Sequence, residues 1–181
     1  MAHALMATIA IGDVHGNVRA LDDLLARLAS KILREDTLVF LGDYIDRGPE
    51  SKACIARIMD LQRSASFNVV TLLGNHEQWL LQTYRDPTWH SWLLGMDGLT
   101  TIRSDSAEAA DALTAAVDQL GFRIVQDRLA LPYELFLDCV PTEHLKFPLS
   151  LKTYWRTADA ICVHGGLDPA VGALEVHLRS T

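Results

Sequence analysis

The chain has 181 residues, of which 49% are hydrophobic and 22% are charged. This composition is typical of a globular protein with a substantial core. The formal net charge of −7 argues against a nucleic-acid-binding surface, because such a surface needs clustered basic residues. No apolar stretch reaches the length of a membrane span. We therefore expect neither nucleic acid nor a membrane as partner, and the composition leaves the oligomeric state open.

The three cysteines, Cys54, Cys139 and Cys162, are widely spaced and form no C-x-x-C pair. They indicate neither a disulfide framework nor a thiolate zinc site, and they favour a reducing, cytoplasmic location. Residues 1–13 are apolar but carry no basic leader, so they are read as leading into a first strand rather than as a signal peptide.

The first half of the chain alternates short apolar strands with amphipathic helices. In chain order, the pattern predicts a strand at 5–11, a helix at 17–30, a strand at 37–41, a helix at 51–63, and a strand at 67–73 followed by a third helix. This order implies a parallel sheet with right-handed crossovers. Loops at the carboxyl ends of parallel strands meet at one edge of the sheet.

The second half reads differently. Residues 86–131 predict a helical insertion near the mouth of a site, with one helix at 107–121. A short helix is expected at 141–151, and two strands within 152–166 are separated by a turn at 157–159. Two tryptophans of the insertion, Trp89 and Trp92, either pack in a core or stack on a ligand, and packing is favoured. We expect residues 1–181 to form a single domain.

Four polar loops follow the predicted strands: "GDVHG" (12–16), "GDYIDRG" (42–48), "GNHE" (74–77) and "VHGGLDP" (163–169). They supply aspartate, histidine and asparagine without a thiolate, which favours manganese, iron or zinc held by oxygen and imidazole ligands. A bridging carboxylate can hold two such ions about 3.5–4 Å apart. Taken singly, each loop is an ordinary turn, Asn75 a helix cap, and Asp46 with Arg47 a surface ion pair. Four such loops on strand ends favour a metal site.

These loops, in this order, resemble the signature of the phosphoprotein phosphatases of bacterial type, the Ser/Thr protein phosphatase family within the calcineurin-like metallophosphoesterases. The resemblance runs from Ile9 to Pro169. It implies an α/β fold, a calcineurin-like β-sandwich flanked by helices, with a dinuclear metal centre at the strand ends. The implied cofactors are two divalent metal ions, manganese being expected and iron or zinc the alternatives.

The resemblance also implies metal ligands, position by position. Asp13 and His15 would bind the first ion, and Asp43 would bridge both ions. Asn75 and His164 would bind the second ion.

Further roles follow from the same resemblance. Arg47 matches the arginine that grips the substrate phosphate, for which a planar guanidinium is suited. His76 matches the general acid, and Asp46 the carboxylate that pairs with it. A hydroxide bridging the two metals would attack phosphorus in line. Glu77 is assigned no chemistry beyond a supporting or helix-start role.

The family pattern includes another metal-binding histidine and another phosphate-binding arginine downstream of the histidine loop. The later residue His177 follows His164 too closely to match that histidine. We therefore expect the chain to be C-terminally incomplete, with an incomplete second sheet, a weak second metal site and little or no activity by itself. A natural short form is the alternative.

Three functions remain. The first is a metal-dependent phosphomonoester hydrolase, a Ser/Thr protein phosphatase acting on a phosphorylated protein or a small phosphoester. The second is a symmetrical dinucleoside tetraphosphatase, and the spelling of "GDYIDRGPES" and "GNHE" favours the phosphatase over it. The third is a non-catalytic fragment or binding module, which has no need of Arg47, Asp46 and His76.

Overall fold

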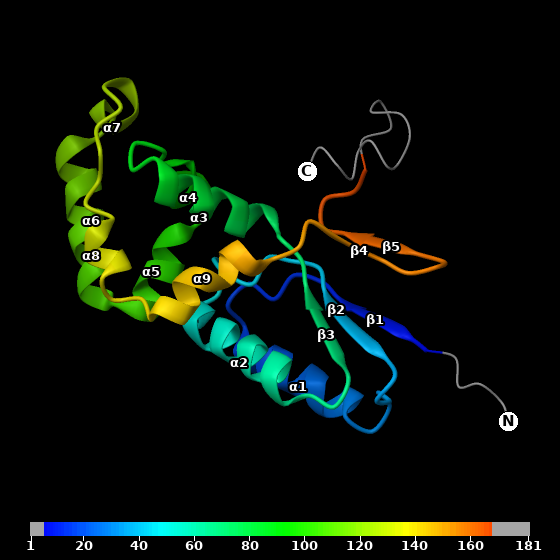
Figure 1. The fold of residues 1–181 in the computed structure, drawn as a ribbon. Helices are drawn as coiled ribbons and strands as arrows, with labels where there is room; N and C mark the ends of the chain where they lie inside the picture. The colour runs from blue at the N-terminus through cyan, green and yellow to red at the C-terminus, as the bar shows by residue number, and fades with distance from the viewer. Residues whose placement is uncertain (1–5, 168–181) are drawn as a thin grey trace, which may run out of the picture.

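The computed structural model describes residues 6–167. In chain order its elements are β1 (Thr8–Ile11), α1 (Val18–Leu28), β2 (Thr37–Phe40), α2 (Ser51–Ser64), β3 (Asn68–Thr71), α3 (Asn75–Arg85), α4 (Ser91–Gly95), α5 (Gly98–Asp105), α6 (Ala107–Leu120), α7 (Arg123–Gln126), α8 (Glu134–Leu137), α9 (Thr142–Ser150), β4 (Tyr154–Arg156) and β5 (Ile161–Val163). Figure 1 shows the strands at one end of the molecule and α4 to α8 at the other. The predicted α/β fold is confirmed.

The first three strands form the predicted parallel sheet, in the order β1-β2-β3. Each strand is shorter than its apolar run, and β3 shows why. After Thr71 the amide of Leu72 still donates to the carbonyl of Phe40 at 2.9 Å, but Leu72 forms an isolated parallel bridge with Lys152. The amide of Leu73 then donates to the carbonyl of Lys152 at 2.7 Å. The apolar residues at the end of this run therefore join the first sheet to the segment that leads into β4.

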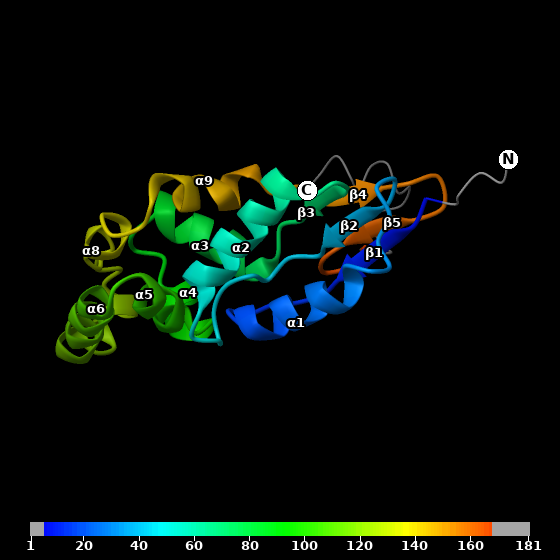
Figure 2. The same ribbon diagram turned by 90° about the horizontal axis from the view of Figure 1, so that it is seen from below.

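Side chains of the sheet alternate between two apolar clusters, as the pleat of a strand requires. Leu38 and Phe40 of β2 pack with the buried leucines and isoleucines of α1 and α2. Val39, between them, lies in a separate cluster that Trp155 and Cys162 of the β4–β5 hairpin cover. Figure 2 shows the strands of the sheet lying between α1 and β4. The sheet is thus covered by helices on one face and by a small second sheet on the other.

The second sheet is an antiparallel pair of β4 and β5 in the described part of the chain, with Tyr154 opposite Val163. The amide of Thr157 donates to the carbonyl of Ala160, which closes the predicted turn. Both strands and the small size of this sheet agree with the sequence-based prediction. His164 follows β5 directly, so the hairpin carries it to the carboxyl ends of the other strands.

Residues 86–131, called the helical segment below, contain α4 to α7. The predicted helix at 107–121 is confirmed as α6, which begins where the Ser106 hydroxyl accepts from the amide of Ala109 at 3.1 Å. It ends at Gly121, whose φ of 53° suits glycine. The predicted short helix is confirmed as α9. None of the described helices is both long and apolar enough to cross a bilayer.

Candidate metal centre

The loops after β1 and β2 are joined by backbone hydrogen bonds. The amides of Val14 and His15 both donate to the carbonyl of Asp43, at 3.0 and 2.9 Å. The amide of Gly16 donates to the carbonyl of Tyr44 at 2.8 Å. These contacts bring the side chains of the first loop against Asp43, at the carboxyl ends of the parallel strands.

The imidazole of His15 faces two carboxylates. Its Nδ1 lies 2.8 Å from the carbonyl of Ile45, to which it can only donate. In that neutral tautomer Nε2 carries a lone pair, and it lies 3.6 Å from a carboxylate oxygen of both Asp13 and Asp43. This nitrogen is buried and has no hydrogen-bond partner among residues 6–167. A lone pair facing carboxylate oxygens is the arrangement that a bound cation would satisfy.

His164 repeats this arrangement on the other side of Asp43. Its Nδ1 lies 3.1 Å from the carbonyl of Leu41. Its Nε2 therefore faces the Oδ1 of Asn75 at 2.8 Å and the Oδ2 of Asp43 at 3.4 Å. Asp13, Asp43 and His164 offer ligand atoms that all lie within 4.8 Å of one another. Because Asp43 also belongs to the His15 group, the two sets of acceptor atoms share one carboxylate.

Asp46 and His76, called the acid pair below, are buried, with exposures of 0% and 1%. The Nδ1 of His76 lies 2.7 Å from the Oδ2 of Asp46. Burial lowers the pKa of His76, but the hydrogen bond to Asp46 and the charges of Asp43 and Asp46 together outweigh it. The pKa of His76 therefore lies above the ordinary histidine value.

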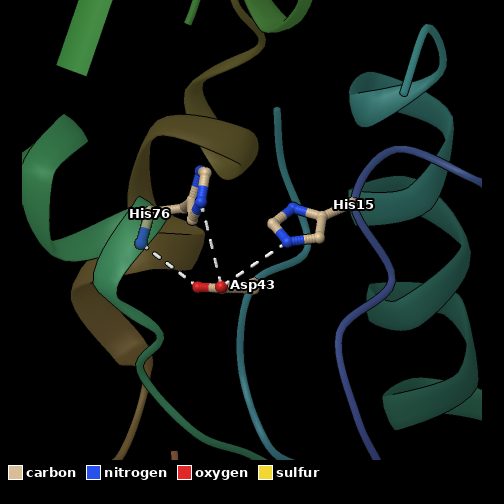
Figure 3. A group of neighbouring side chains, drawn as sticks. All are labelled: His15, Asp43 and His76. Atoms are coloured by element: carbon tan, nitrogen blue, oxygen red, sulfur yellow. Dashed lines mark hydrogen bonds and ion pairs between the residues drawn. The ribbon is translucent and has the colours of Figure 1, made fainter. Parts of the chain in front are cut away.

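The other ring nitrogen of His76 points toward the centre. Figure 3 shows the rings of His76 and His15 on either side of the Asp43 carboxylate, which also accepts from the backbone amide of His76. The Nε2 of His76 lies 3.9 Å from Asp43 and 3.4 Å from a guanidinium nitrogen of the exposed residue Arg47. His15, Asp43 and His76 likewise offer ligand atoms within 4.8 Å of one another.

The backbone around these side chains is strained. Among residues 6–167, six non-glycine residues have a positive φ, and four of them are His15, Asp43, Asp46 and Arg47, with φ between 43° and 68°. Such conformations are uncommon for residues with a Cβ and tend to gather at functional sites. The surrounding contacts therefore hold these four side chains in place against a local conformational cost.

Close packing of the loops explains two of the motif glycines. A Cβ on Gly74 would overlap the side chain and amide of Asp43. Gly42 has a φ of 122°, and a Cβ there would lie 2.6 Å from the backbone of Gly74 and 3.0 Å from His164. The loops after β2 and β3 approach each other this closely only because both positions lack a side chain.

Glu77, to which the sequence assigned no chemistry, fixes the loop that carries Asp43. Its buried carboxylate accepts four backbone N–H groups, from Asp43, Tyr44, Ile45 and Gly74, at 2.8–3.2 Å. Burial and, after it, the charge of Asp43 raise the pKa of Glu77 to about 7 against the opposing effect of the N–H donors. The sequence could have indicated this role, because Glu77 is the third residue of α3 and a glutamate at that position can bind the backbone amide at the start of its helix.

The two tryptophans of the helical segment differ. Trp92 is fully buried, and its indole nitrogen donates to Asp46 at 2.9 Å. Trp89 is 38% exposed and, with Trp79 and Arg128, lines a cavity of about 530 Å³. The favoured packing role is thus observed for Trp92. Asp168, Pro169 and His177 lie outside the described residues, so the predictions that concern them stay predictions.

Known proteins share sequence with this chain. Residues 6–178 match the sequence model of the calcineurin-like phosphoesterases. The chain is 34% identical over 106 residues to serine/threonine-protein phosphatase 1 of Salmonella typhimurium, covering 57% of this chain and 45% of that protein. It is 43% identical over 79 residues to the symmetrical bis(5'-nucleosyl)-tetraphosphatase of Edwardsiella ictaluri, covering 44% of this chain and 26% of that protein. The aligned part is thus less than half the length of either relative.

The fold is shared with a solved structure. A cold-active protein-tyrosine phosphatase of a psychrophilic Shewanella species superposes with a TM-score of 0.60 at 22% sequence identity. The superposition covers 97% of this chain and 47% of the other. At this identity the likeness concerns the fold alone.

Proposed function

Because the chain belongs to the calcineurin-like phosphoesterase family, we propose that it carries the catalytic centre of a metal-dependent phosphomonoester hydrolase. Members of this family use divalent metal ions. The observation that carries the proposal is the pair of histidine Nε2 atoms, on His15 and His164, that face the shared carboxylate of Asp43 while the Nδ1 atoms of both rings contact backbone carbonyls. Acceptor atoms that face one another in this way suit cations.

Two divalent ions fit the donor set. Asp13 and His15 would hold one ion, Asn75 and His164 the other, and Asp43 would contact both. When bound, the ions supply an activated water and neutralise charge on the phosphoryl oxygens. Oxygen and imidazole ligands without a thiolate suit manganese, which we propose as the metal, with iron or zinc as alternatives.

We assign His76 to proton transfer rather than to metal binding. The guanidinium of Arg47 lies beside its Nε2, where it disfavours a divalent ion and attracts an anionic phosphoryl oxygen. Arg47 also lowers the pKa of His76, but the hydrogen bond to Asp46 and the charges of Asp43 and Asp46 outweigh this effect. Hydrolysis forms a bond between a water oxygen and phosphorus and breaks the bond between phosphorus and the leaving oxygen, which keeps the electron pair. The Nε2 of protonated His76 gives its proton to that oxygen, and Asp46 stabilises the imidazolium.

Arg47 would bind the phosphoryl group. Its side chain is exposed, and its guanidinium lies next to His76, where the leaving oxygen would depart. Its planar fork can contact two phosphoryl oxygens at once, and these contacts strengthen as negative charge develops. The arginine thereby orients the substrate toward both the acid pair and the metal ligands.

For the substrate, we propose a phosphoserine or phosphothreonine side chain of a protein. The alignment with the Salmonella phosphatase supports this, since it covers more of the chain than the alignment with the tetraphosphatase does. The higher identity to the tetraphosphatase over a shorter region supports a dinucleoside tetraphosphate as the second candidate. Both reactions would use the same metal ligands and the same acid pair.

The experiment compares a phosphothreonine peptide with diadenosine tetraphosphate as substrates of the manganese-loaded full-length protein. Isothermal titration with manganese alone runs in parallel. We expect manganese binding and a higher kcat/KM for the peptide. A higher kcat/KM for the nucleotide would establish the second candidate instead. Manganese binding without hydrolysis of either substrate would favour a non-catalytic module, and failure to bind manganese would overturn the proposal.

A further inference from the structure

We propose that Trp92 and Thr101 of the helical segment are positioning residues that hold the Asp46 carboxylate in the orientation in which it binds His76. This inference rests on the proposed function, because positioning matters for hydrolysis only if His76 is the acid. It also assigns a role to the helical segment, for which the sequence suggested only a place near the mouth of the site.

The first contact comes from α4. The indole nitrogen of Trp92 donates to the Oδ2 of Asp46 at 2.9 Å, the same oxygen that contacts His76 at 2.7 Å. Trp92 is fully buried. Its indole lies so close to Gly98, the first residue of α5, that a Cβ there would be 2.8 Å from the ring. The indole is therefore fixed by packing, and its N–H group has a set direction.

The second contact comes from α5 and engages the other carboxylate oxygen. The hydroxyl of Thr101 donates to the Oδ1 of Asp46 at 2.5 Å. The same hydroxyl oxygen accepts from the backbone amide of Asp46 at 2.9 Å and lies 3.0 Å from the hydroxyl of Ser51. Because the Thr101 hydroxyl has one proton, and Asp46 receives it, Ser51 must be the donor in the contact between the two hydroxyls.

These contacts fix the orientation of Asp46. One carboxylate oxygen is held by Thr101 and the other by Trp92, so rotating the carboxylate would break both bonds inside a fully buried site. With Nδ1 bound to Asp46, the imidazole presents Nε2 toward Arg47. The helical segment thereby sets the direction in which the proton is given.

The test uses substitutions that remove a hydrogen bond but keep most of the side-chain volume, Trp92→Phe and Thr101→Val. Thr101→Ser keeps the hydroxyl and serves as the conservative rescue. Trp89→Phe and Thr100→Val are matched controls from the same segment that make no contact with Asp46 in the structure. Circular dichroism and thermal unfolding verify that each variant is folded, and either test variant alone suffices if the other does not fold.

The activity readout is the dependence on the leaving group. An acid is needed for phenyl phosphate, whose leaving oxygen is basic, and much less for 2,4-dinitrophenyl phosphate. We expect both test variants to lose about tenfold or more in kcat with phenyl phosphate, a fraction of the roughly 10²–10⁴ that general acid catalysis supplies. With dinitrophenyl phosphate they should stay near wild type, as should the controls and Thr101→Ser with both substrates. An equal loss with both esters would overturn the positioning role.

A second readout does not require hydrolysis. The Nδ1 proton of His76, identified by its loss in His76→Asn, is followed by NMR in the metal-free protein. We expect faster exchange with water in the Trp92→Phe and Thr101→Val variants and wild-type exchange in the controls. Unchanged exchange in both folded variants would overturn the inference. Faster exchange in a full-length protein that hydrolyses no phosphoester would show that Trp92 and Thr101 hold the acid pair in place, but it would refute the proposed function.

Discussion

Two sides of the candidate metal centre are built differently. Asp46, His76 and Glu77 lie on a side with exposures of 0–1%, where every carboxylate oxygen has a donor. Asp13 and His164 lie on a side that is open to water, with side-chain exposures of 52% and 17%. The buried side is held in place by the fold, whereas the open side leaves acceptor atoms available for ions. Substitutions on the two sides should therefore produce different kinds of loss.

Asp43 belongs to both sides, so Asp43→Asn should have the largest effect. We expect kcat/KM to fall by at least about 10²–10³-fold, since this is the cost of losing one electrostatic contact to a transition state. The fold should survive, because asparagine tolerates the positive φ of 55° at this position. Phosphoester hydrolysis and circular dichroism measure the two effects. Asp97→Asn is the matched control, since Asp97 is exposed and has a φ of 61°.

Wild-type turnover in Asp43→Asn would show that the shared carboxylate is not needed for hydrolysis. The proposed bridging role of Asp43 would then be wrong.

Glu77→Gln tests the buried side. One of its carboxylate oxygens accepts from Tyr44 and Ile45, and the other from Asp43 and Gly74. In either orientation the new amide NH₂ group would face two backbone N–H donors. We expect the free energy of unfolding to fall by roughly 2–4 kcal/mol, because each buried donor left unsatisfied costs about 1–3 kcal/mol.

Urea denaturation measures the effect of Glu77→Gln. The control is Gln78→Ala, one residue further along α3 and exposed, which should change stability by no more than about 0.5 kcal/mol. A similar small change in Glu77→Gln would mean that the glutamate does not support the loop energetically.

Asn75→Ala tests the open side and should show the opposite pattern. The side chain is exposed, so we expect the stability of the metal-free protein to change by no more than about 0.5 kcal/mol. The affinity for manganese should nevertheless fall at least about tenfold, a loss that even indirect supports of a metal site produce. Isothermal titration and thermal unfolding compare the two quantities. Unchanged manganese affinity would remove Asn75 from the proposed ligand set.

The smallest expected effect is a pH dependence of stability that arises from His90, a buried residue of the helical segment. The Nε2 of His90 donates to the carbonyl of Leu129 at 2.8 Å, so its Nδ1 accepts from the hydroxyl of Tyr133 at 3.1 Å. Burial lowers the pKa of His90, because protonation would place a positive charge inside the core. The unfolded chain therefore binds this proton more readily than the folded protein does.

His90 should consequently stabilise the fold fully above the ordinary histidine pKa of about 6.5 and progressively less as the pH falls below it. We expect wild type to lose more stability between pH 7 and pH 5 than His90→Gln, which has no titrating ring. The difference in slope cannot exceed about 1.4 kcal/mol per pH unit for one proton. Urea denaturation at several pH values measures it, and parallel slopes would contradict the prediction.

Much of this protein follows from local sequence. The apolar runs before Gly12, Gly42 and Gly74 predicted parallel strands, and the polar residues after each run predicted one shared edge. These predictions succeed because strand length, alternation and turn chemistry are properties of neighbouring residues. The helices at 51–63 and 107–121 were likewise predictable from the periodicity of their apolar side chains. The end of β3 was not, because Leu72 forms its bridge with Lys152, a residue far away along the chain.

The supports of the candidate site were decided by the tertiary structure alone. Trp92 and Thr101 meet Asp46 from 46 and 55 residues away along the chain, and no local pattern records such contacts. Glu77 reaches a loop 32–34 residues away, so the sequence marked its helix-start position without revealing what it holds. The residue types that can bind a metal ion or transfer a proton are visible in the sequence. The hydrogen bonds that orient them depend on where distant elements pack, which is settled only when the chain folds.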